Sequence, residues 1–310
     1  MPLSPSRPGA LGALTIGGRR FEWGRRTYIM GILNLTPDSF SGDGLGTDVQ
    51  AALERARQFE AQGADLLDLG GESTRPSAQQ VSVEEELRRV LPVLERLQGT
   101  VALPLSVDTY KAAVARRAVE AGAALINNVQ GPAGSPAPDP VLSLVAAELG
   151  VPLVIAHNHR GTEYNDLLSD VKWELAVLVQ QAREAGVPKG HIIVDPGLGF
   201  GKSPAQSLAL LRHLDELQAL GQPLLVGPSR KSMIGAVLEG LPPDQRLEGT
   251  AAVVALAIAL GADIVRVHDV GAMARVARLA DAVARGWRGP QDSPSFPGAG
   301  APGRPSGVAL

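Results

Sequence analysis

The 310-residue sequence contains no cysteine, few aromatic residues and little net charge. Without cysteine the chain can form no disulfide, no thiolate metal site and no cysteine nucleophile. Its 29 basic and 32 acidic side chains nearly cancel, so it lacks the strong positive field that binding to nucleic acid or to an anionic membrane needs. We therefore expect no nucleic-acid partner, no membrane partner and a cytoplasmic location.

The sequence also lacks a long apolar run. Residues 1–10 contain three prolines and no continuous apolar core, unlike a secretory signal. The most apolar stretch, residues 250–262, is shorter than the about 20 residues that cross a bilayer, and it leads into Asp263. We expect a buried helix there, followed by a strand.

The two ends differ in composition from the middle of the chain. Residues 1–13 and 288–310 are rich in Pro, Gly and Ser and have little to bury, which predicts disordered ends. The 45% of apolar residues is ample for one core, so we expect a single domain at residues 14–287.

Short Val/Ile/Leu-rich runs alternate with longer helical segments from Tyr28 onward. This alternation is typical of repeated βα units with a parallel sheet. The predicted strands are residues 28–34, 65–69, 103–108, 123–127, 152–157, 191–195, 223–226 and 263–267. Their spacing averages roughly 34 residues, the size of a βα repeat. A doubly wound open sheet shares much of the pattern, but eight repeats favour an α/β fold, a single (β/α)8 TIM barrel.

Local signals support these elements. Short β-type runs flank Gly17 and Gly18 and predict an N-terminal β-hairpin, which could plug the lower end of the barrel. Ser82 precedes a run of glutamates and predicts a helix N-cap. Gly63 and Gly122 stand where two helices should end in a left-handed cap before the next strand.

Polar side chains stand at or just beyond the ends of almost all predicted strands. They are Asn34, Asp108, Asn127, His157, Asp195, Lys231 and Arg266. In a barrel these positions converge on the C-terminal face, where such folds build their active sites. Any one of them could instead cap a helix, but seven together favour a site. Asp108, Asp195 and Asn127 suit the edge of an aminopyrimidine ring, and pairing with Lys or Arg inside the barrel is the alternative.

Two loops could close over a ligand. Residues 34–44 are glycine-rich around Phe40, as lid loops often are. Residues 70–77 include Arg75, which could bind phosphate through two N–H groups, although a solvated loop is the alternative.

Three further segments suit a flat or anionic ligand. Residues 195–202 alternate glycine, which could let a flat ligand approach the backbone. Residues 229–232 lie where a helix should start, so free N–H groups, hydroxyls and two cations could meet an anion there. Arg266 and His268 alternate along an extended stretch, so both would face a pyrophosphate.

The blocks GILNLTPDSFS, GGESTRP, SVDT, INN, DPGLGFGK, GPSRKSM and RVHDV resemble, in order and spacing, those of dihydropteroate synthases. Seven ordered blocks over about residues 28–271 are far more specific than a lone glycine motif. The resemblance implies a folate-pathway transferase that joins 6-hydroxymethyl-7,8-dihydropterin pyrophosphate to p-aminobenzoate and releases pyrophosphate. It further implies a Mg²⁺-assisted, SN1-like reaction, inhibition by sulfonamides and a homodimer formed through the late helices.

The resemblance also assigns roles to individual residues. The pterin ring would be held by Asp108, Asn127, Asp195, Lys231 and Arg266. The pyrophosphate would be held by Asn34, Arg75, Arg266 and His268, with Asn34 also a Mg²⁺ ligand. The p-aminobenzoate site would consist of Phe40, Thr74, Pro76, Phe200 and Ser232, together with Lys231. Catalytic roles fall to Asp38, Arg75, Lys231, Arg266 and His268, with Asp38 stabilising positive charge on the pterin methylene.

The chain departs from the family pattern at three places. His159 stands for a pterin-contacting methionine in the segment that begins at His157, Asn128 stands for an aspartate, and Ser77 stands for a glycine. Two alternatives follow, a non-catalytic pterin-binding relative and a barrel of the methyltetrahydrofolate methyltransferase type. A barrel of the methyltransferase type needs no pyrophosphate site. The Arg266 and His268 pair, which suits a pyrophosphate, therefore argues against this second alternative.

Overall fold

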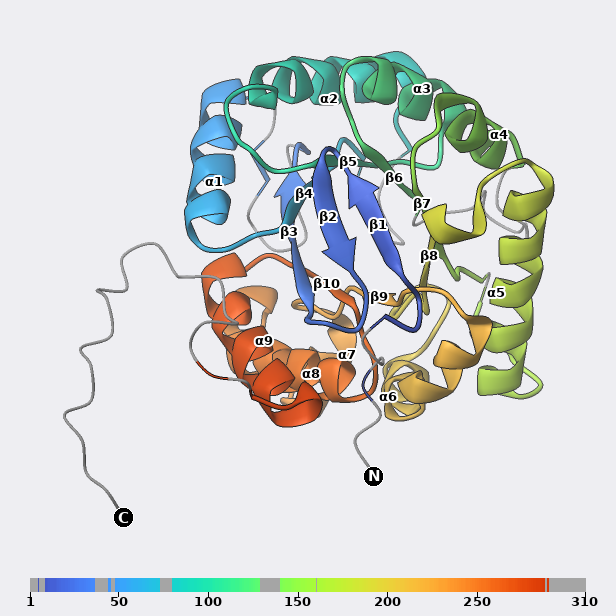
Figure 1. Ribbon diagram of the computed structural model, residues 1–310. Helices are drawn as coiled ribbons and strands as arrows, with labels where there is room; N and C mark the ends of the chain where they lie inside the picture. Colours follow the sequence, from blue (N-terminus) through green and yellow to red (C-terminus); the bar gives the residue numbers. More distant parts are fainter. Residues whose placement is uncertain are drawn as a thin grey trace.

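The computed structural model describes residues 5, 9–36, 44–45, 48–72, 80–128, 140–159, 161–287 and 289. Parallel strands form a ring within them, with helices on the outside (Figure 1). The strands of the ring are β3 (Tyr28–Asn34), β4 (Leu66–Gly70), β5 (Leu105–Asp108), β6 (Leu125–Asn128), β7 (Leu153–Ala156), β8 (Ile192–Asp195), β9 (Leu225–Val226) and β10 (Ile264–Val267). They are hydrogen bonded in the order β8-β7-β6-β5-β4-β3-β10-β9, and a parallel bridge between Val194 and Leu224 joins β8 to the chain just before β9. The sheet therefore curls round on itself, which confirms the predicted barrel over an open doubly wound sheet.

Helices follow the strands along the chain and cover the outer face of the ring (Figure 1). They are α1 (Val49–Ala61), α2 (Val83–Leu97), α3 (Ala112–Glu120), α4 (Pro140–Leu149), α5 (Leu167–Glu184), α6 (Pro204–Arg212), α7 (Ser232–Val237), α8 (Leu247–Ala259) and α9 (Val270–Arg285), with 3-10 turns at Lys189–His191, Leu214–Leu220 and Pro243–Gln245. The apolar stretch near residue 250 is helix α8, as predicted, and it buries Val253, Val254 and Ile258. In the part of the chain that the structure describes, no helix has the length and apolarity to cross a membrane.

The predicted caps are present. The Ser82 side chain accepts a hydrogen bond from the Glu85 N–H at 3.2 Å and so satisfies one of the free donors at the start of α2. Gly63 and Gly122 have φ of 94° and 108°, a conformation that side chains disfavour. These local signals therefore mark the boundaries of the helices from sequence alone.

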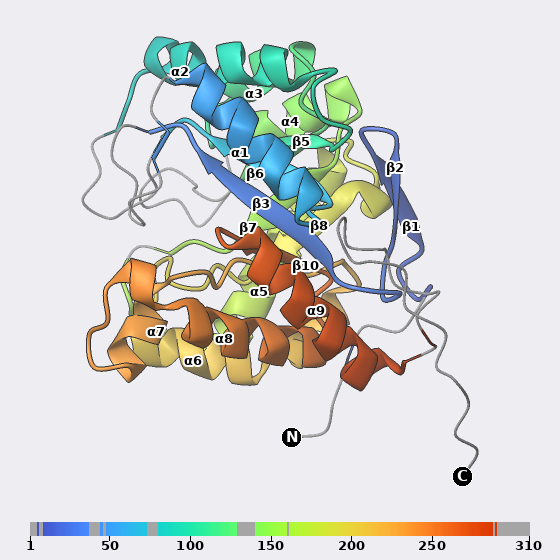
Figure 2. The same ribbon diagram turned by 90° about the vertical axis from the view of Figure 1, so that its left-hand side faces the viewer.

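The predicted hairpin is formed by β1 (Ala13–Ile16) and β2 (Arg19–Glu22), which pair antiparallel. It lies across the end of the barrel where the strands begin (Figure 2). Its buried side chains and the first inward-facing layer of the barrel form one apolar cluster. The members from the hairpin and the chain beyond it are Leu14, Ile16, Phe21 and Trp23, and those from the barrel include Met30, Leu66, Leu125, Val154, Ile193, Leu225 and Ile264. The hairpin thus closes the lower end, as expected.

The predicted disordered ends, residues 1–13 and 288–310, lie largely outside the described residues and stay a prediction. Residues 9–12 are described and continue the hairpin, since the Gly9 N–H donates to the Trp23 carbonyl at 3.2 Å and the Trp23 N–H donates to the Gly12 carbonyl at 3.2 Å.

The hairpin plug provides a test of the fold. Trp23 is 1% exposed and its ring meets that of Tyr28 edge-on at 5.7 Å. We expect Trp23→Ala to lower the free energy of unfolding by about 3–5 kcal/mol, because it leaves a cavity in the cluster. Trp287→Ala is the matched control, since Trp287 is 72% exposed and should change stability by less than about 0.5 kcal/mol. Urea unfolding measures both, and equal effects would show that the hairpin contributes little to the barrel's stability.

Candidate active site

The barrel interior changes from apolar to polar between two successive layers of side chains. Side chains of a strand alternate between its faces, so residues two apart point to the same side. Two positions beyond the apolar residues Leu66, Leu125, Ile193 and Ile264 stand Asp68, Asn127, Asp195 and Arg266. These polar side chains therefore enter the barrel from four strands, toward the C-terminal mouth where barrel enzymes bind their ligands.

Arg266 lies at the centre of a buried ionic cluster. Its Nε donates to Asp68 Oδ2 at 2.6 Å and its Nη2 donates to Asp108 Oδ2 at 2.8 Å. Asn127 Nδ2 donates to the same Asp68 oxygen at 2.8 Å. One guanidinium thus binds carboxylates from β4 and β5, and the carboxylate from β4 also binds an amide from β6. The predicted alternative is that Asp108 pairs with Lys or Arg inside the barrel, and it does pair with Arg266.

Asp68 is a site residue that the sequence prediction missed. Its side chain is 0% exposed, and it sits in an otherwise apolar strand. A buried charge must find a partner or lose several kcal/mol, so an acid inside an apolar run is itself a signal of an interior ionic site. Asp68 carries that signal in the middle of β4, whereas the predicted polar residues stand at or beyond strand ends.

Three buried oxygens in this cluster have no hydrogen-bond partner among the described residues: Asp68 Oδ1, Ser106 Oγ and Asn127 Oδ1. They come from the adjacent strands β4, β5 and β6, and Asp68 is opposite Ser106 in the register. Buried polar atoms in native proteins are almost always satisfied. Acceptors of this kind, side by side, suit a polar ligand with several N–H groups.

Burial raises the pKa of Asp108 to about 7. The positive charge of Arg266 acts in the opposite direction, and nearby Asp68 adds to the increase because it makes a second negative charge more costly. Burial also raises the pKa of Asp195, and nearby Lys231 opposes that shift. The pKa of Lys231 is lowered to about 8, again mainly by burial. Groups with strongly shifted pKa values that gather at one place are typical of functional sites.

The loop after β8 brings three predicted residues together. The Gly197 N–H donates to Asp195 Oδ1 at 2.7 Å and orients that carboxylate. Lys231 Nζ donates to the Leu198 carbonyl and lies 4.1 Å from the centre of the Phe200 ring. Asp195, Phe200 and Lys231 therefore form one wall of the mouth.

Two of the alternating glycines of this loop, Gly197 and Gly201, lie against the protein's own backbone. Gly197 and Gly201 have φ of 68° and 58°. A Cβ on either would lie 1.8 Å from the His157 carbonyl oxygen or 2.0 Å from that of His159. The close approach that requires glycine at these two positions is thus made by the protein's own backbone beyond β7, and the approach of a flat ligand to this loop stays a prediction.

The segment before α7 separates the two cations predicted to bind an anion there. Helix α7 begins at Ser232, as the sequence predicts. The Ser232 side chain is exposed. Arg230 instead forms a two-point ion pair with Asp269, through Nε at 3.0 Å and Nη2 at 2.7 Å. Of the two cations, Arg230 thus binds Asp269, while Lys231 contacts the glycine-rich loop.

His268 lies beside Ser229, whose Oγ accepts from the His268 backbone N–H at 3.2 Å and is 2.9 Å from its Nδ1. Ser229 thereby holds one edge of the imidazole, with Nε2 on the opposite edge. Asn34 ends β3, and its carbonyl accepts from the Leu45 N–H at 2.9 Å. The remaining predicted residues, Asp38, Phe40, Thr74, Arg75 and Pro76, lie outside the described residues.

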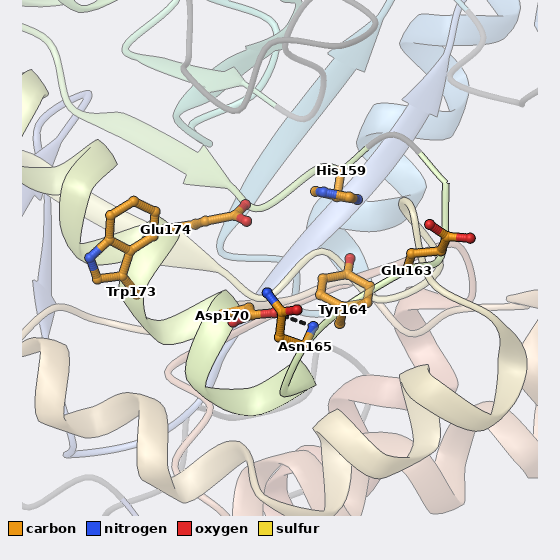
Figure 3. A pocket seen from close by; sticks show the side chains of 7 residues that line it. All are labelled: His159, Glu163, Tyr164, Asn165, Asp170, Trp173 and Glu174. Atoms are coloured by element: carbon orange, nitrogen blue, oxygen red, sulfur yellow. Dashed lines mark hydrogen bonds between the residues drawn. The ribbon is translucent and has the colours of Figure 1, made fainter.

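His159 lines a separate cavity of about 310 Å³ between the segment after β7 and the start of α5 (Figure 3). Its ring stands 5.1 Å from that of Tyr164, and Glu174 of α5 points toward the end of β7 in the same view. The histidine that replaces a family methionine thus faces this cavity. Within the described ranges, no group of three or more His, Asp or Glu side chains could hold a metal ion.

Comparisons with known proteins agree with this geometry. The pterin binding enzyme family matches residues 30–268. A dihydropteroate synthase of Bacillus subtilis is 49% identical over 258 residues, 83% of this chain and 89% of that protein. A solved dihydropteroate synthase from Clostridium difficile, in the presence of pteroic acid, has a TM-score of 0.80 at 46% identity and covers 86% of this chain and 99% of its own. One from Xanthomonas albilineans, with 4-aminobenzoic acid, has a TM-score of 0.81 at 45% identity and covers 87% and 97%. With the barrel, the buried acid and amide cluster and these likenesses together, the chain belongs to the dihydropteroate synthases, within the family of pterin-binding enzymes.

Proposed function

We propose that this chain condenses 6-hydroxymethyl-7,8-dihydropterin pyrophosphate with p-aminobenzoate to give 7,8-dihydropteroate and pyrophosphate in folate biosynthesis. The observation that carries the proposal is the buried cluster around Arg266, whose three unpartnered oxygens match a ring edge rich in N–H donors. The two solved relatives, with pteroic acid and with 4-aminobenzoic acid, support both halves of the product.

The pterin ring would lie deepest. Asp108, Asn127 and Asp195 offer the acceptors, and Lys231 offers an ammonium at the rim. A pterin presents an amino group and ring N–H groups along one edge, so each would meet a carboxylate or amide oxygen. Asp68 would hold Arg266 and Asn127 in place through its Oδ2. Its Oδ1 and the Ser106 Oγ would accept from the ring together with Asn127 Oδ1.

The diphosphate would lie toward β10 and β3. Arg266 and His268 alternate on β10 and its extension, and Asn34 ends the adjacent strand. Arg75, which lies outside the described residues, stays part of this prediction. Developing negative charge on the leaving group would be taken up by these donors, which is the usual source of such catalysis.

Mg²⁺ fits this arrangement. Mg²⁺ prefers oxygen ligands and commonly binds through one or two protein groups plus substrate phosphates and waters. Asn34 at the end of β3 can supply an amide oxygen, and the diphosphate would supply others. When bound, the ion would neutralise charge on the leaving diphosphate.

p-Aminobenzoate would lie at the outer end, between Phe200, Lys231 and Ser232. Its carboxylate would meet the start of α7, and Phe40, Thr74 and Pro76 would complete the site from outside the described residues. The aniline nitrogen then attacks the methylene carbon after the carbon–oxygen bond to the diphosphate breaks, and it loses its proton afterwards. No strong base is needed, and charge stabilisation at the methylene by Asp38 stays a prediction.

Product formation tests the proposal. Purified protein mixed with the pterin diphosphate, p-aminobenzoate and Mg²⁺ is expected to release pyrophosphate and to form dihydropteroate in equal amounts. Tight pterin binding without pyrophosphate release would instead show a non-catalytic pterin-binding protein. Methyl transfer from methyltetrahydrofolate would show the other type of barrel.

Ser232 tests the outer half of the site. We expect Ser232→Ala to raise the KM for p-aminobenzoate by ~tenfold, because the hydroxyl would no longer bond the charged carboxylate, and to leave the KM for the pterin nearly unchanged. Ser169→Ala on exposed α5 surface is the control. Steady-state kinetics with each substrate varied measures the difference, and equal changes in both KM values would contradict the assigned role.

A homodimer is proposed through α8 and α9, which pack side by side. Leu256 of α8 and Leu279 and Val283 of α9 are 55%, 69% and 67% exposed. Exposed apolar side chains gathered on one face often mark an interface. Light scattering is expected to give twice the 32.2 kDa of one chain, and Leu279→Glu should give the monomer while Leu144→Glu on α4 should not. A monomeric wild-type protein would contradict the proposed dimer.

The cytoplasmic location expected from the sequence stays a prediction.

A further inference from the structure

A second lysine, besides Lys231, is buried against the backbone of the glycine-rich loop, residues 196–201. Lys202 is 6% exposed. Its Nζ donates to the carbonyls of Gly197 at 3.1 Å and Phe200 at 3.0 Å, and it lies 2.8 Å from His157 Nδ1. An ammonium has three N–H donors and no acceptor, so these three partners use all of its capacity.

The third partner of this lysine connects the loop to the barrel wall. His157 is 0% exposed, and its neighbour Lys202 can only donate in its charged form, so Nδ1 accepts and the proton sits on Nε2. Nε2 lies 2.9 Å from Glu174 Oε2 on α5, although it does not meet hydrogen-bond geometry there. Burial, followed by the charge on Lys202, lowers the pKa of His157 to about 3, so the imidazole stays neutral at ordinary pH. Burial also lowers the pKa of Lys202 to about 7, and nearby Asp195 opposes that shift, so its three contacts belong to the protonated form of Lys202. Lys202, His157 and Glu174 therefore form a row from the loop to α5.

The loop that Lys202 holds carries the groups of the site. Gly197 gives its carbonyl to Lys202 and its N–H to Asp195, so one peptide segment links the lysine to that carboxylate. Phe200 gives its carbonyl to Lys202, while its ring lies under Lys231. The loop backbone is thus held by two lysines: Lys202 donates to the carbonyls of Gly197 and Phe200, and Lys231 donates to that of Leu198.

We propose that Lys202 is a positioning residue for the reaction, which sets the conformation of residues 196–201 so that Asp195 meets the pterin and Phe200 meets p-aminobenzoate. It contacts neither substrate. The expected effects of Lys202 on KM and kcat rest on the proposed function. Its expected effect on the conformation of the loop rests on the loop contacts alone.

Replacing this lysine would remove a donor from three buried acceptors. In Lys202→Met the Phe200 carbonyl and the Nδ1 of His157 lose the lysine as their donor, while the Gly197 carbonyl keeps the Phe200 N–H at 3.0 Å. Buried groups rarely tolerate such a loss. Arginine would not substitute, because its planar fork cannot direct three donors from one atom as an ammonium does. The loop should therefore change conformation or become mobile in either variant.

The test compares Lys202→Met and Lys202→Arg with wild type in hydrogen exchange and in kinetics. We expect faster exchange of the amides of residues 197–201 in the ligand-free variants, with exchange in α2 and α3 unchanged. We also expect the KM for p-aminobenzoate to rise by ~tenfold and kcat to fall by ~tenfold, because small misplacements of binding groups reduce the rate strongly. Lys172→Met is the matched control, since Lys172 lies on the surface of α5 with its Nζ 3.5 Å from Glu216.

Two outcomes separate the inference from the proposed function. A wild-type protein that forms no dihydropteroate would contradict the function, while exchange in the loop would still test the role of Lys202. An active wild type with unchanged exchange and kinetics in Lys202→Met would overturn the inference. If Lys202→Met does not fold, His157→Phe removes the same link from the other side and is expected to raise the KM for p-aminobenzoate by ~threefold with the same local exchange. Wild-type behaviour of that variant would equally overturn it.

Discussion

Arg266→Ala is expected to reduce both stability and turnover more than any other single change in the site. The guanidinium holds Asp68 and Asp108 together, so its removal leaves two buried carboxylates without their cation. Removing one partner of a buried ion pair costs about 3–5 kcal/mol. We expect urea unfolding to show a loss of this size.

The same variant should lose catalysis. Arg266 is also a proposed donor to the departing diphosphate, and removal of one such donor typically costs ~10²–10³ in kcat. Arg116→Ala is the matched control, because Arg116 forms a largely exposed pair with Glu148 and should cost at most about 1 kcal/mol. A fully active, equally stable Arg266→Ala protein would show that the cluster is neither structural nor catalytic.

Asp108→Asn is expected to weaken pterin binding and to remove a pH dependence. The asparagine keeps the shape but loses the charge that would accept from the pterin, at a cost of about 1.5–3 kcal/mol, or ~10–100-fold in the KM for the pterin. In the wild type, kcat/KM for the pterin should rise as Asp108 ionises near pH 7 and fall as Lys231 loses its proton near pH 8. The variant should lose the rise and keep the fall.

Stability should follow the same group. The folded pKa of Asp108 is raised above its ordinary value of 3.8 to about 7, so between these values the unfolded chain ionises this carboxyl while the folded chain keeps its proton. The contribution of Asp108 to the free energy of unfolding therefore decreases as the pH rises from about 4 to about 7. Asp108→Asn should remove this contribution, and Asp244→Asn, on the exposed 3-10 turn Pro243–Gln245, should not. A variant with the wild-type pH profile would show that another group titrates.

The barrel could be predicted because its signals are local. Each strand is a short apolar run and each helix has a period, a cap or a terminal glycine, so β3 (Tyr28–Asn34) was predicted to the residue. Strand β9 begins at Leu225 and not at 223, because Pro223 has no N–H with which to continue the ladder, although its carbonyl still accepts from the Val194 N–H of β8. Boundaries shift where pairing with a distant strand, and not local preference, decides.

The interior of the site depended on contacts that no local pattern contains. The link from Arg266 to Asp68 spans 198 residues, and that from Lys202 to His157 spans 45. The glycines at 197 and 201 were expected at a ligand, but their neighbour is the backbone after β7, which only the closed barrel brings close. Sequence therefore located the site and most of its charged groups, while the pairing of those groups required the three-dimensional structure.

The position of a bound pterin decides whether the buried cluster around Arg266 is the pterin site. A crystal structure of this protein with a bound pterin is expected to show the ring edge within hydrogen-bond distance of Asp108, Asn127 and Asp195, with the three unpartnered oxygens of the cluster now facing donors. A ring bound elsewhere, with the cluster of Asp68, Asp108, Asn127 and Arg266 not contacting it, would show that this cluster is not the pterin site.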